Sequence, residues 1–63
     1  MTNLDIQKHA ALFAAARARI GQRLAPEEAW HAWSREYGVT GPGARYLFEA
    51  EYEIQLEAQQ RRH

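Results

Sequence analysis

The sequence predicts an all-α fold, in which two long helices form an antiparallel hairpin and a short helix connects them. Apolar residues recur at helical spacings of three, four and seven, and glycine and proline gather at two breaks. No stretch alternates apolar and polar residues as a half-buried strand would. The 63 residues, 46% of them hydrophobic, are enough for one compact helical domain over 1–63.

The first helix is expected over about 3–23. Asn3 is a candidate N-cap, and Asp5 then falls in the first turn, where a carboxylate complements the helix dipole. The alanine-rich stretch that follows has the highest helix propensity in the chain, whereas Gly21 weakens the last turn. One apolar stripe joins Ile6, Ala10, Phe13, Ile20 and Leu24, and a smaller face of Ala11, Ala14 and Ala18 allows another helix to approach closely.

The second helix is expected over about 26–37. Pro26 suits its first position, where the missing N–H costs nothing, and Gly38 suits the left-handed residue just after its end. Between them, helical spacing produces an aromatic ridge made of Trp30, Trp33 and Tyr37.

The third helix is expected over about 42–61, after a turn that contains Gly-Pro-Gly. One apolar line contains Leu47, Ala50, Ile54 and Ala58, and Phe48 and Tyr52 widen it. The opposite, solvated edge contains glutamates spaced by four, which are Glu49, Glu53 and Glu57.

The small size and the lack of cysteine together favour self-association. A domain of this length buries only about 60% of the surface that its unfolded chain exposes, and without cysteine it has neither disulfides nor thiolate metal sites. Because one hairpin cannot cover two wide apolar stripes, we expect a homodimer. No run of about 18 apolar residues is present and the N-terminus has no signal-peptide pattern, so we expect a soluble cytoplasmic protein.

Two charged residues interrupt the apolar faces. Arg17 falls on the stripe of the first helix, and Glu51 falls among the apolar residues of the third. Arg17 can instead cover apolar surface with its methylene stem and extend its guanidinium to water. An unpaired carboxylate is costly when buried, so our hypothesis is that Arg17 and Glu51 pair, within one chain or across a dimer.

These patterns define two candidate interfaces. The dimer or core interface is expected to contain Phe13, Arg17, Ile20, Leu47, Phe48, Glu51, Tyr52 and Ile54. The partner-binding set is expected to contain Arg45, Tyr46, Glu49, Glu53, Trp30 and Trp33. Aromatic residues at helical spacing often form core, and that alternative stays open for the tryptophans. Seven large rings are nevertheless many for one monomer of this size to bury.

The sequence offers no chemistry for catalysis, for a metal or for another cofactor. Ser34 is the only serine and lies near no recognisable relay of histidine and acid. No two histidines have ligand spacing within one helix, and the glycines follow no strand that would mark a phosphate loop. We therefore expect a non-enzymatic protein that carries no metal and no cofactor.

The distribution of charge leaves two main function classes open. The net charge is zero, but Lys8, Arg19 and Arg23 make the first helix basic, so a small dimeric DNA-binding regulator is the alternative. The second helix begins acidic and the third has a glutamate edge, which disfavours direct contact with DNA and suits a basic protein surface. A protein–protein interaction module is therefore the leading interpretation, and an assembly factor is a third.

Two segments carry a resemblance to a known group of proteins. Ala10–Ile20 (Ala-Ala-Leu-Phe-Ala-Ala-Ala-Arg-Ala-Arg-Ile) and Arg45–Ile54 (Arg-Tyr-Leu-Phe-Glu-Ala-Glu-Tyr-Glu-Ile) resemble small helical accessory proteins of temperate phages, among them quorum-sensing anti-activators. The resemblance spans most of 4–56. It implies a helical dimer that inhibits or modulates a host regulatory protein, such as a transcription activator bound at its DNA-contacting surface.

Overall fold

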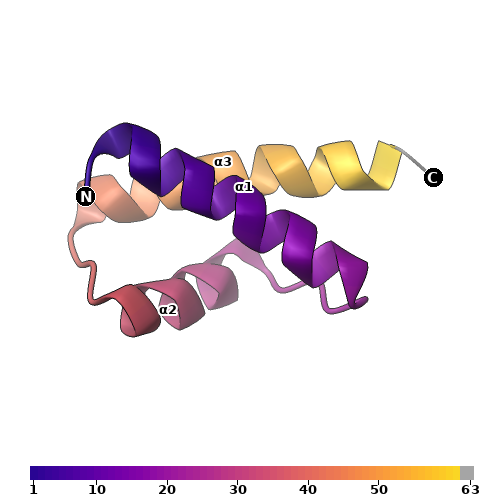
Figure 1. Ribbon diagram of the computed structural model, residues 1–63, viewed down its shortest axis with the longest axis horizontal. Helices are drawn as coiled ribbons and strands as arrows, with labels where there is room; N and C mark the ends of the chain where they lie inside the picture. Colours follow the sequence, from indigo (N-terminus) through magenta and orange to yellow (C-terminus); the bar gives the residue numbers. More distant parts are fainter. Residues whose placement is uncertain (62–63) are drawn as a thin grey trace.

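The computed structural model describes residues 1–61 and contains three helices (Figure 1). Their bounds are α1, Asn3–Arg19; α2, Pro26–Tyr37; and α3, Pro42–Arg61. No strand occurs in this described part of the chain, so the all-α prediction is confirmed. None of these helices combines the length and the apolar character that crossing a membrane requires.

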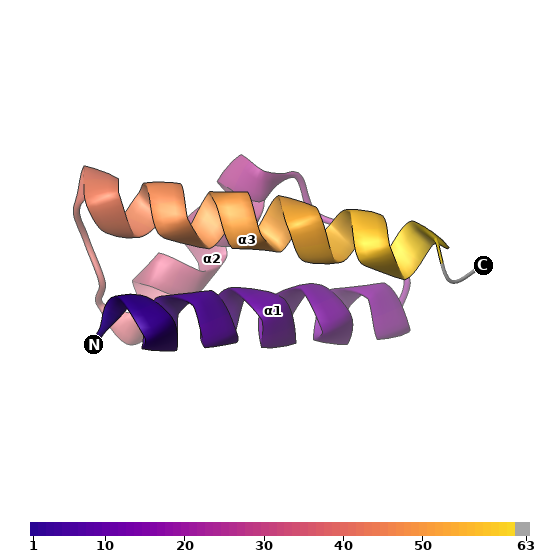
Figure 2. The same cartoon turned by 90° about the horizontal axis from the view of Figure 1, so that it is seen from above.

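The arrangement of the helices differs from the expected antiparallel hairpin. In Figures 1 and 2, α1 and α3 start at the same end of the molecule and run side by side in the same direction, while α2 runs back along one side of this pair. The contacts between α1 and α3 are the most extensive in the molecule. The reason is topological: each short connection reverses the chain, and two reversals restore the original direction. α2 is therefore the second helix of a three-helix fold and packs on the other two, instead of only connecting two helices of a hairpin.

The start of α1 differs from the prediction by one residue. Thr2, and not Asn3, is the N-cap, because its hydroxyl accepts a hydrogen bond from the Asp5 N–H at 3.2 Å. The Asp5 carboxylate in turn accepts from the Thr2 N–H at 3.2 Å. Within this reciprocal capping box, the pKa of Asp5 lies below its ordinary value, chiefly because the hydrogen bond from the Thr2 N–H favours the charged carboxylate.

The end of α1 comes earlier than the expected residue 23. Gly21 adopts a left-handed conformation, with φ of 74°, directly after the C-cap residue Ile20. The Gly21 N–H donates to the Ala18 carbonyl at 3.2 Å and the Gln22 N–H donates to the Arg17 carbonyl at 2.9 Å. These are the two hydrogen bonds of a Schellman motif, so Gly21 ends the helix instead of merely weakening its last turn.

The bounds of α2 and α3 agree with the prediction. Pro26 occupies the first turn of α2, and the Glu28 carboxylate accepts from the Ala25 N–H at 3.2 Å. Gly38 closes the helix in the left-handed region with φ of 66°. A turn of only four residues then leads to α3, which begins at Pro42.

The core contains small residues from α1 and large aromatic residues from the other two helices. The buried residues are Ile6, Ala10, Ala14, Ala29, Trp30, Trp33, Phe48 and Tyr52. Ala10 and Ala14 are fully buried and have no side chain beyond Cβ, so the rings of α2 and α3 lie directly against α1. The Trp33 and Phe48 rings stack with centroids 4.7 Å apart.

The polar atoms of the buried rings have partners. The Tyr52 hydroxyl donates to the Leu24 carbonyl at 2.7 Å, which ties α3 to the connection between α1 and α2. The Trp33 indole N–H donates to His9 Nδ1 at 3.3 Å, which ties α2 to α1. Within the described residues, every buried side-chain nitrogen or oxygen has a hydrogen-bond partner.

Candidate protein-interaction site

A shallow groove runs along the outer face of α3, and four of the six predicted partner-binding residues line it. We call it the α3 groove, and its lining residues are Pro42, Arg45, Tyr46, Glu49, Ala50 and Glu53. These residues lie in the first turns of α3, where positions three and four apart share one face of the helix. An aromatic ring, a cation and two carboxylates thus share one surface.

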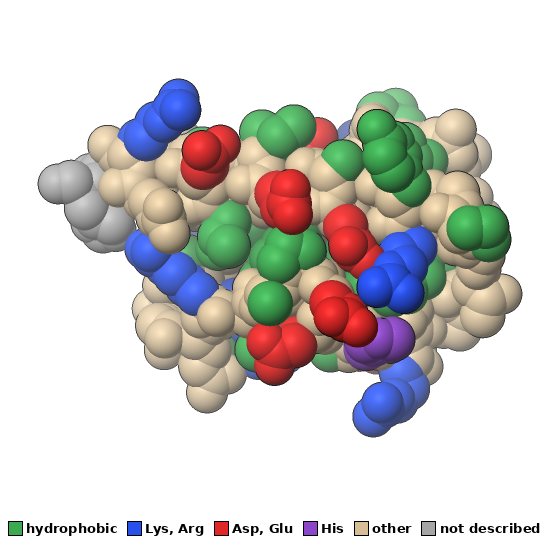
Figure 3. Space-filling model, turned by 180° about the vertical axis from the view of Figure 1, so that it is seen from behind, with side chains coloured by type: hydrophobic (Ala, Val, Ile, Leu, Met, Phe, Trp, Pro, Cys, Tyr) green, Lys and Arg blue, Asp and Glu red, His purple; other side chains and the backbone are tan. Residues whose placement is uncertain are grey.

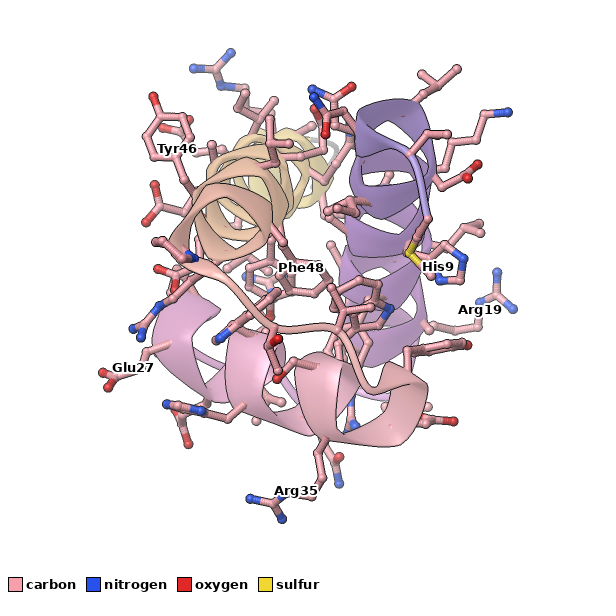
Figure 4. All side chains as sticks on the ribbon, turned by 90° about the vertical axis from the view of Figure 1, so that its left-hand side faces the viewer. His9, Arg19, Glu27, Arg35, Tyr46 and Phe48 are labelled. Carbon is pink, nitrogen blue, oxygen red and sulfur yellow. The ribbon has the colours of Figure 1, made fainter. Side chains whose placement is uncertain are left out.

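Tyr46 is the most exposed large apolar side chain in the described structure. It is 74% exposed, whereas Phe48, two positions later, is fully buried. Two residues correspond to about 200° around a helix, so the two side chains point in opposite directions. Figure 4 shows Phe48 directed into the centre of the molecule and Tyr46 directed away from α3 into solvent. An exposed ring of this kind is the type of residue that anchors protein interfaces.

Charges at the groove are unevenly neutralised. Arg45 Nε pairs with the Glu49 carboxylate, and Arg45 Nη2 lies 4.0 Å from Glu27 Oε1 on α2. Glu27 in turn lies 3.9 Å from His31 Nε2. Within residues 1–61, Glu53 has no cation within salt-bridge distance. The groove therefore presents one carboxylate that is available to a cation from outside.

The acidic character extends beyond the groove. Figure 3 shows acidic side chains gathered around apolar ones on the side of the molecule seen from behind. A second hollow adjoins the α3 groove and shares Pro42 and Arg45 with it; its other lining residues are Trp30, Ser34, Val39, Thr40 and Gly41. A partner that fills the groove can therefore also reach the turn between α2 and α3.

The tryptophans of the predicted partner-binding set are core residues instead. Trp33 is 1% exposed and Trp30 is 6% exposed. α2 lies across both long helices, so its tryptophans face inward; Trp33 stacks on Phe48 and Trp30 packs against the same ring at a tilt. Only an edge of Trp30 reaches the second hollow.

The six uncharged residues of the predicted dimer or core set divide into three groups. Phe48 and Tyr52 are buried, and Phe13 and Leu47 are partly buried against the core. Ile20 and Ile54 are 62% and 58% exposed. Ile20 lies outside the expected stripe because α1 has already ended at Arg19.

Arg17 and Glu51 do not pair within the chain. Arg17 Nη1 donates to Gln22 Oε1 at 3.0 Å, and its guanidinium carbon lies 4.9 Å from the Phe13 ring centroid. The Glu51 carboxylate accepts from Gln55 Nε2 at 2.8 Å. Each charged group is only partly buried and has a local partner, so no pair across the core is required.

Some residues of the site were not predicted. Pro42 and Ala50 line the groove, and Ala50 lies four residues after Tyr46, so helical spacing alone could have placed it there. Glu27 and His31 join the charge network across two helices, and His9 accepts from buried Trp33. The contacts of Glu27 with Arg45 and of His9 with Trp33 join different helices and leave no signal in the spacing of residues, whereas Glu27 and His31 are four residues apart on α2.

Comparisons with known proteins leave the groove as the principal guide to function. No protein-family model, no curated protein and no solved structure matches the chain. Among residues 1–61, no group of three or more histidines or acidic residues is placed to hold a metal ion.

Proposed function

We propose that the protein is a non-enzymatic protein–protein interaction module that binds its partner through the α3 groove. One observation carries the proposal: Arg45, Tyr46, Glu49 and Glu53, selected as contact residues from the sequence, line the same groove. A ring flanked by charged groups provides both an apolar anchor and directional contacts.

The chemistry of the groove favours a basic partner surface. Glu49 already holds Arg45, but Glu53 is exposed and accepts a cation without breaking an ion pair. A lysine or arginine placed there, beside an apolar side chain packed on Tyr46 and Ala50, complements the groove. We propose a host regulatory protein, such as a transcription activator whose basic DNA-contacting surface is covered, and an inhibitory or modulating role. The resemblance to phage accessory proteins is in keeping with this role.

The proposal is tested by affinity capture from a lysate of the cells that make the protein. We expect one stoichiometric partner to bind the wild-type chain, and Tyr46→Ala and Glu53→Lys each to reduce capture at least about tenfold, as loss of an anchor residue does. Raising the salt concentration is expected to weaken capture, because exposed charges are screened.

Matched control variants come from another part of the surface. Tyr37 is 49% exposed and Glu36 is exposed, and both lie at the end of α2, outside the groove. Tyr37→Ala and Glu36→Lys are expected to retain capture. Equal loss in all four variants, or no loss in any of them, would contradict binding at the groove.

The same purified protein separates the proposal from the DNA-binding alternative. Arg19 is exposed and Figure 4 shows it directed into solvent on the side opposite to Tyr46. Binding of DNA by this basic side would give a mobility shift of duplex DNA that is lost steeply as salt rises and that depends on Arg19 and Arg23. A shift of DNA by the wild-type protein alone would favour that function over the interaction module.

We further propose that the module is a homodimer. A chain of this size has little core, and the structure leaves large apolar side chains exposed on several sides; these include Leu4, Leu12, Ile20 and Ile54. Association that covers part of this surface adds the burial that a monomer lacks.

A further inference from the structure

One long face of the molecule is formed by α1 and α3 alone. We call it the open face, and it contains Leu4, Ala11, Ala15 and Ala18 of α1 and Leu47, Ile54 and Ala58 of α3, which share one side of each helix at helical spacing. The residues that contact α2, such as His9 and Arg45, lie on other sides of these helices. Figure 2 views the molecule from this direction, with α1 and α3 side by side and α2 behind them.

The open face has a flat half and a projecting half. On α1 the alanines are partly buried and present little relief, whereas on α3 Ile54 projects and is 58% exposed. Leu4 adds a second exposed apolar side chain, at 60%. A surface that projects on one helix and is flat on the other is self-complementary when it meets a copy of itself with the two helices exchanged.

The flanks of the open face carry opposite charges. Beyond the alanines, the outer side of α1 has Lys8 and Arg19, both exposed. Beyond Ile54, the outer side of α3 has Glu57, also exposed. None of these three groups forms an ion pair within residues 1–61. A second copy that lays its α1 on this α3 therefore brings a basic flank to an acidic one.

We infer that the open face is the interface of the proposed homodimer, with α1 of each copy lying on α3 of the other. A twofold axis parallel to the helices produces this exchange, because it swaps the positions of α1 and α3 and keeps their direction. The inference rests on the proposed homodimer and is independent of binding at the α3 groove.

The register within the chain indicates which residues meet. Phe13 of α1 contacts Phe48 and Tyr52 of α3, so these positions lie at the same level along the molecule. Counted from there, Ile54 is level with Ala15 and Ala18, and Arg19 is level with Glu57 to within about one turn. In the dimer, Ile54 therefore seats on the alanines of the second copy, and Arg19 pairs with its Glu57. Arg17 stays on the Phe13 ring and takes no part.

Sedimentation equilibrium of the purified full chain tests the interface. We expect a dimer, and Ile54→Glu to raise the dissociation constant at least about tenfold, because the twofold axis places the change in the interface twice. Leu12→Glu is the matched control, since Leu12 is 69% exposed on α1 but lies outside the open face. This variant is expected to dimerise as the wild type does.

Reversing the charges of Arg19 and Glu57, singly and together, distinguishes loss of the interface from loss of folding. Arg19→Glu and Glu57→Arg each place like charges together and are expected to weaken the dimer about tenfold. The double variant restores opposite charges and is expected to return to within about threefold of the wild type. Circular dichroism checks that each variant keeps its helices.

The possible failures are distinct. A wild-type monomer at all concentrations overturns both the homodimer and the open face, while capture at the α3 groove is unaffected. A dimer that neither Ile54→Glu nor the charge reversals weaken overturns the open face and leaves the homodimer standing on another surface.

Discussion

Tyr52 shows what one residue contributes to a core this small. Its ring is fully buried against Phe13 and Phe48, and its hydroxyl reaches the carbonyl of Leu24. This one side chain therefore joins α3 to the aromatic core and to the connection after α1. The sequence predicted its place in the apolar face of the third helix, but not the hydrogen bond, because Leu24 is 28 residues away.

Removal of the Tyr52 hydroxyl is expected to destabilise the fold. Tyr52→Phe keeps the ring and its packing but leaves the Leu24 carbonyl without its donor, at a cost of about 1 kcal/mol in the free energy of unfolding. Urea denaturation followed by circular dichroism measures this change. An unchanged midpoint and slope would mean that water replaces the hydroxyl at no cost.

Tyr52 also makes the free energy of unfolding depend on pH in the alkaline range. Burial raises the pKa of Tyr52 above its ordinary value of 10.0, since the charged phenolate is poorly solvated there. The folded state then holds the proton more tightly than the unfolded chain does. Its contribution to stability is full below the unfolded pKa and is lost as pH rises through the higher folded pKa. In urea titrations above pH 10, Tyr52→Phe is expected to lose less stability than the wild type.

At the scale of the elements, glycines set the helix ends more firmly than apolar periodicity does. Gly21 and Gly38 both adopt positive φ, and each directly follows the last turn of a helix. Periodicity alone extended the first helix to about residue 23, since Ile20 and Leu24 continue the stripe. The backbone conformation of Gly21 overrides that pattern, because the Schellman hydrogen bonds satisfy the last carbonyls of α1.

Two glycine substitutions are expected to act in opposite directions. At Gly38, with φ of 66°, no atom would contact an added Cβ, so the cost of Gly38→Ala is conformational alone, about 1 kcal/mol. Gly43 also has free space and lies inside α3 without positive φ, so Gly43→Ala is expected to stabilise by about 0.5 kcal/mol. Thermal unfolding compares the two, and melting temperatures that move in the same direction would contradict this explanation.

The bounds of α2 and α3 were the most predictable feature of this chain. Pro26, Gly38 and the Gly-Pro-Gly turn are local signals, and they place α2 and α3 correctly. The N-cap of α1 was misplaced by one residue because Thr2 and Asn3 are both good caps. Only the reciprocal bond between Thr2 and Asp5 decides between them.

At the scale of the whole molecule, the order of the helices in space could not be predicted from periodicity. A stripe of apolar residues says which side of a helix is buried but not which helix covers it. The fold buries the tryptophans of α2 between the long helices, so they are core residues and not contact residues. Tyr46 is exposed, as a residue of the predicted partner-binding set must be.

The packing leaves α3 with two different exposed surfaces. One is the α3 groove around Tyr46 and Glu53, and the other is the side of Ile54 in the open face. The two surfaces involve different residues, so a dimer formed at the open face leaves the groove available. A small chain can in this way associate with itself and bind a second protein at the same time.

Site-specific photo-crosslinking from position 46 in living cells tests the central claim most directly. p-Benzoylphenylalanine replaces Tyr46 in one variant and Tyr37, which is also exposed but lies outside the groove, in the other. We expect irradiation to crosslink position 46 to a partner protein that is not a second copy of this chain. We expect no crosslink to that partner from position 37. No adduct at position 46, or the same adduct from both positions, would contradict a partner site in the α3 groove.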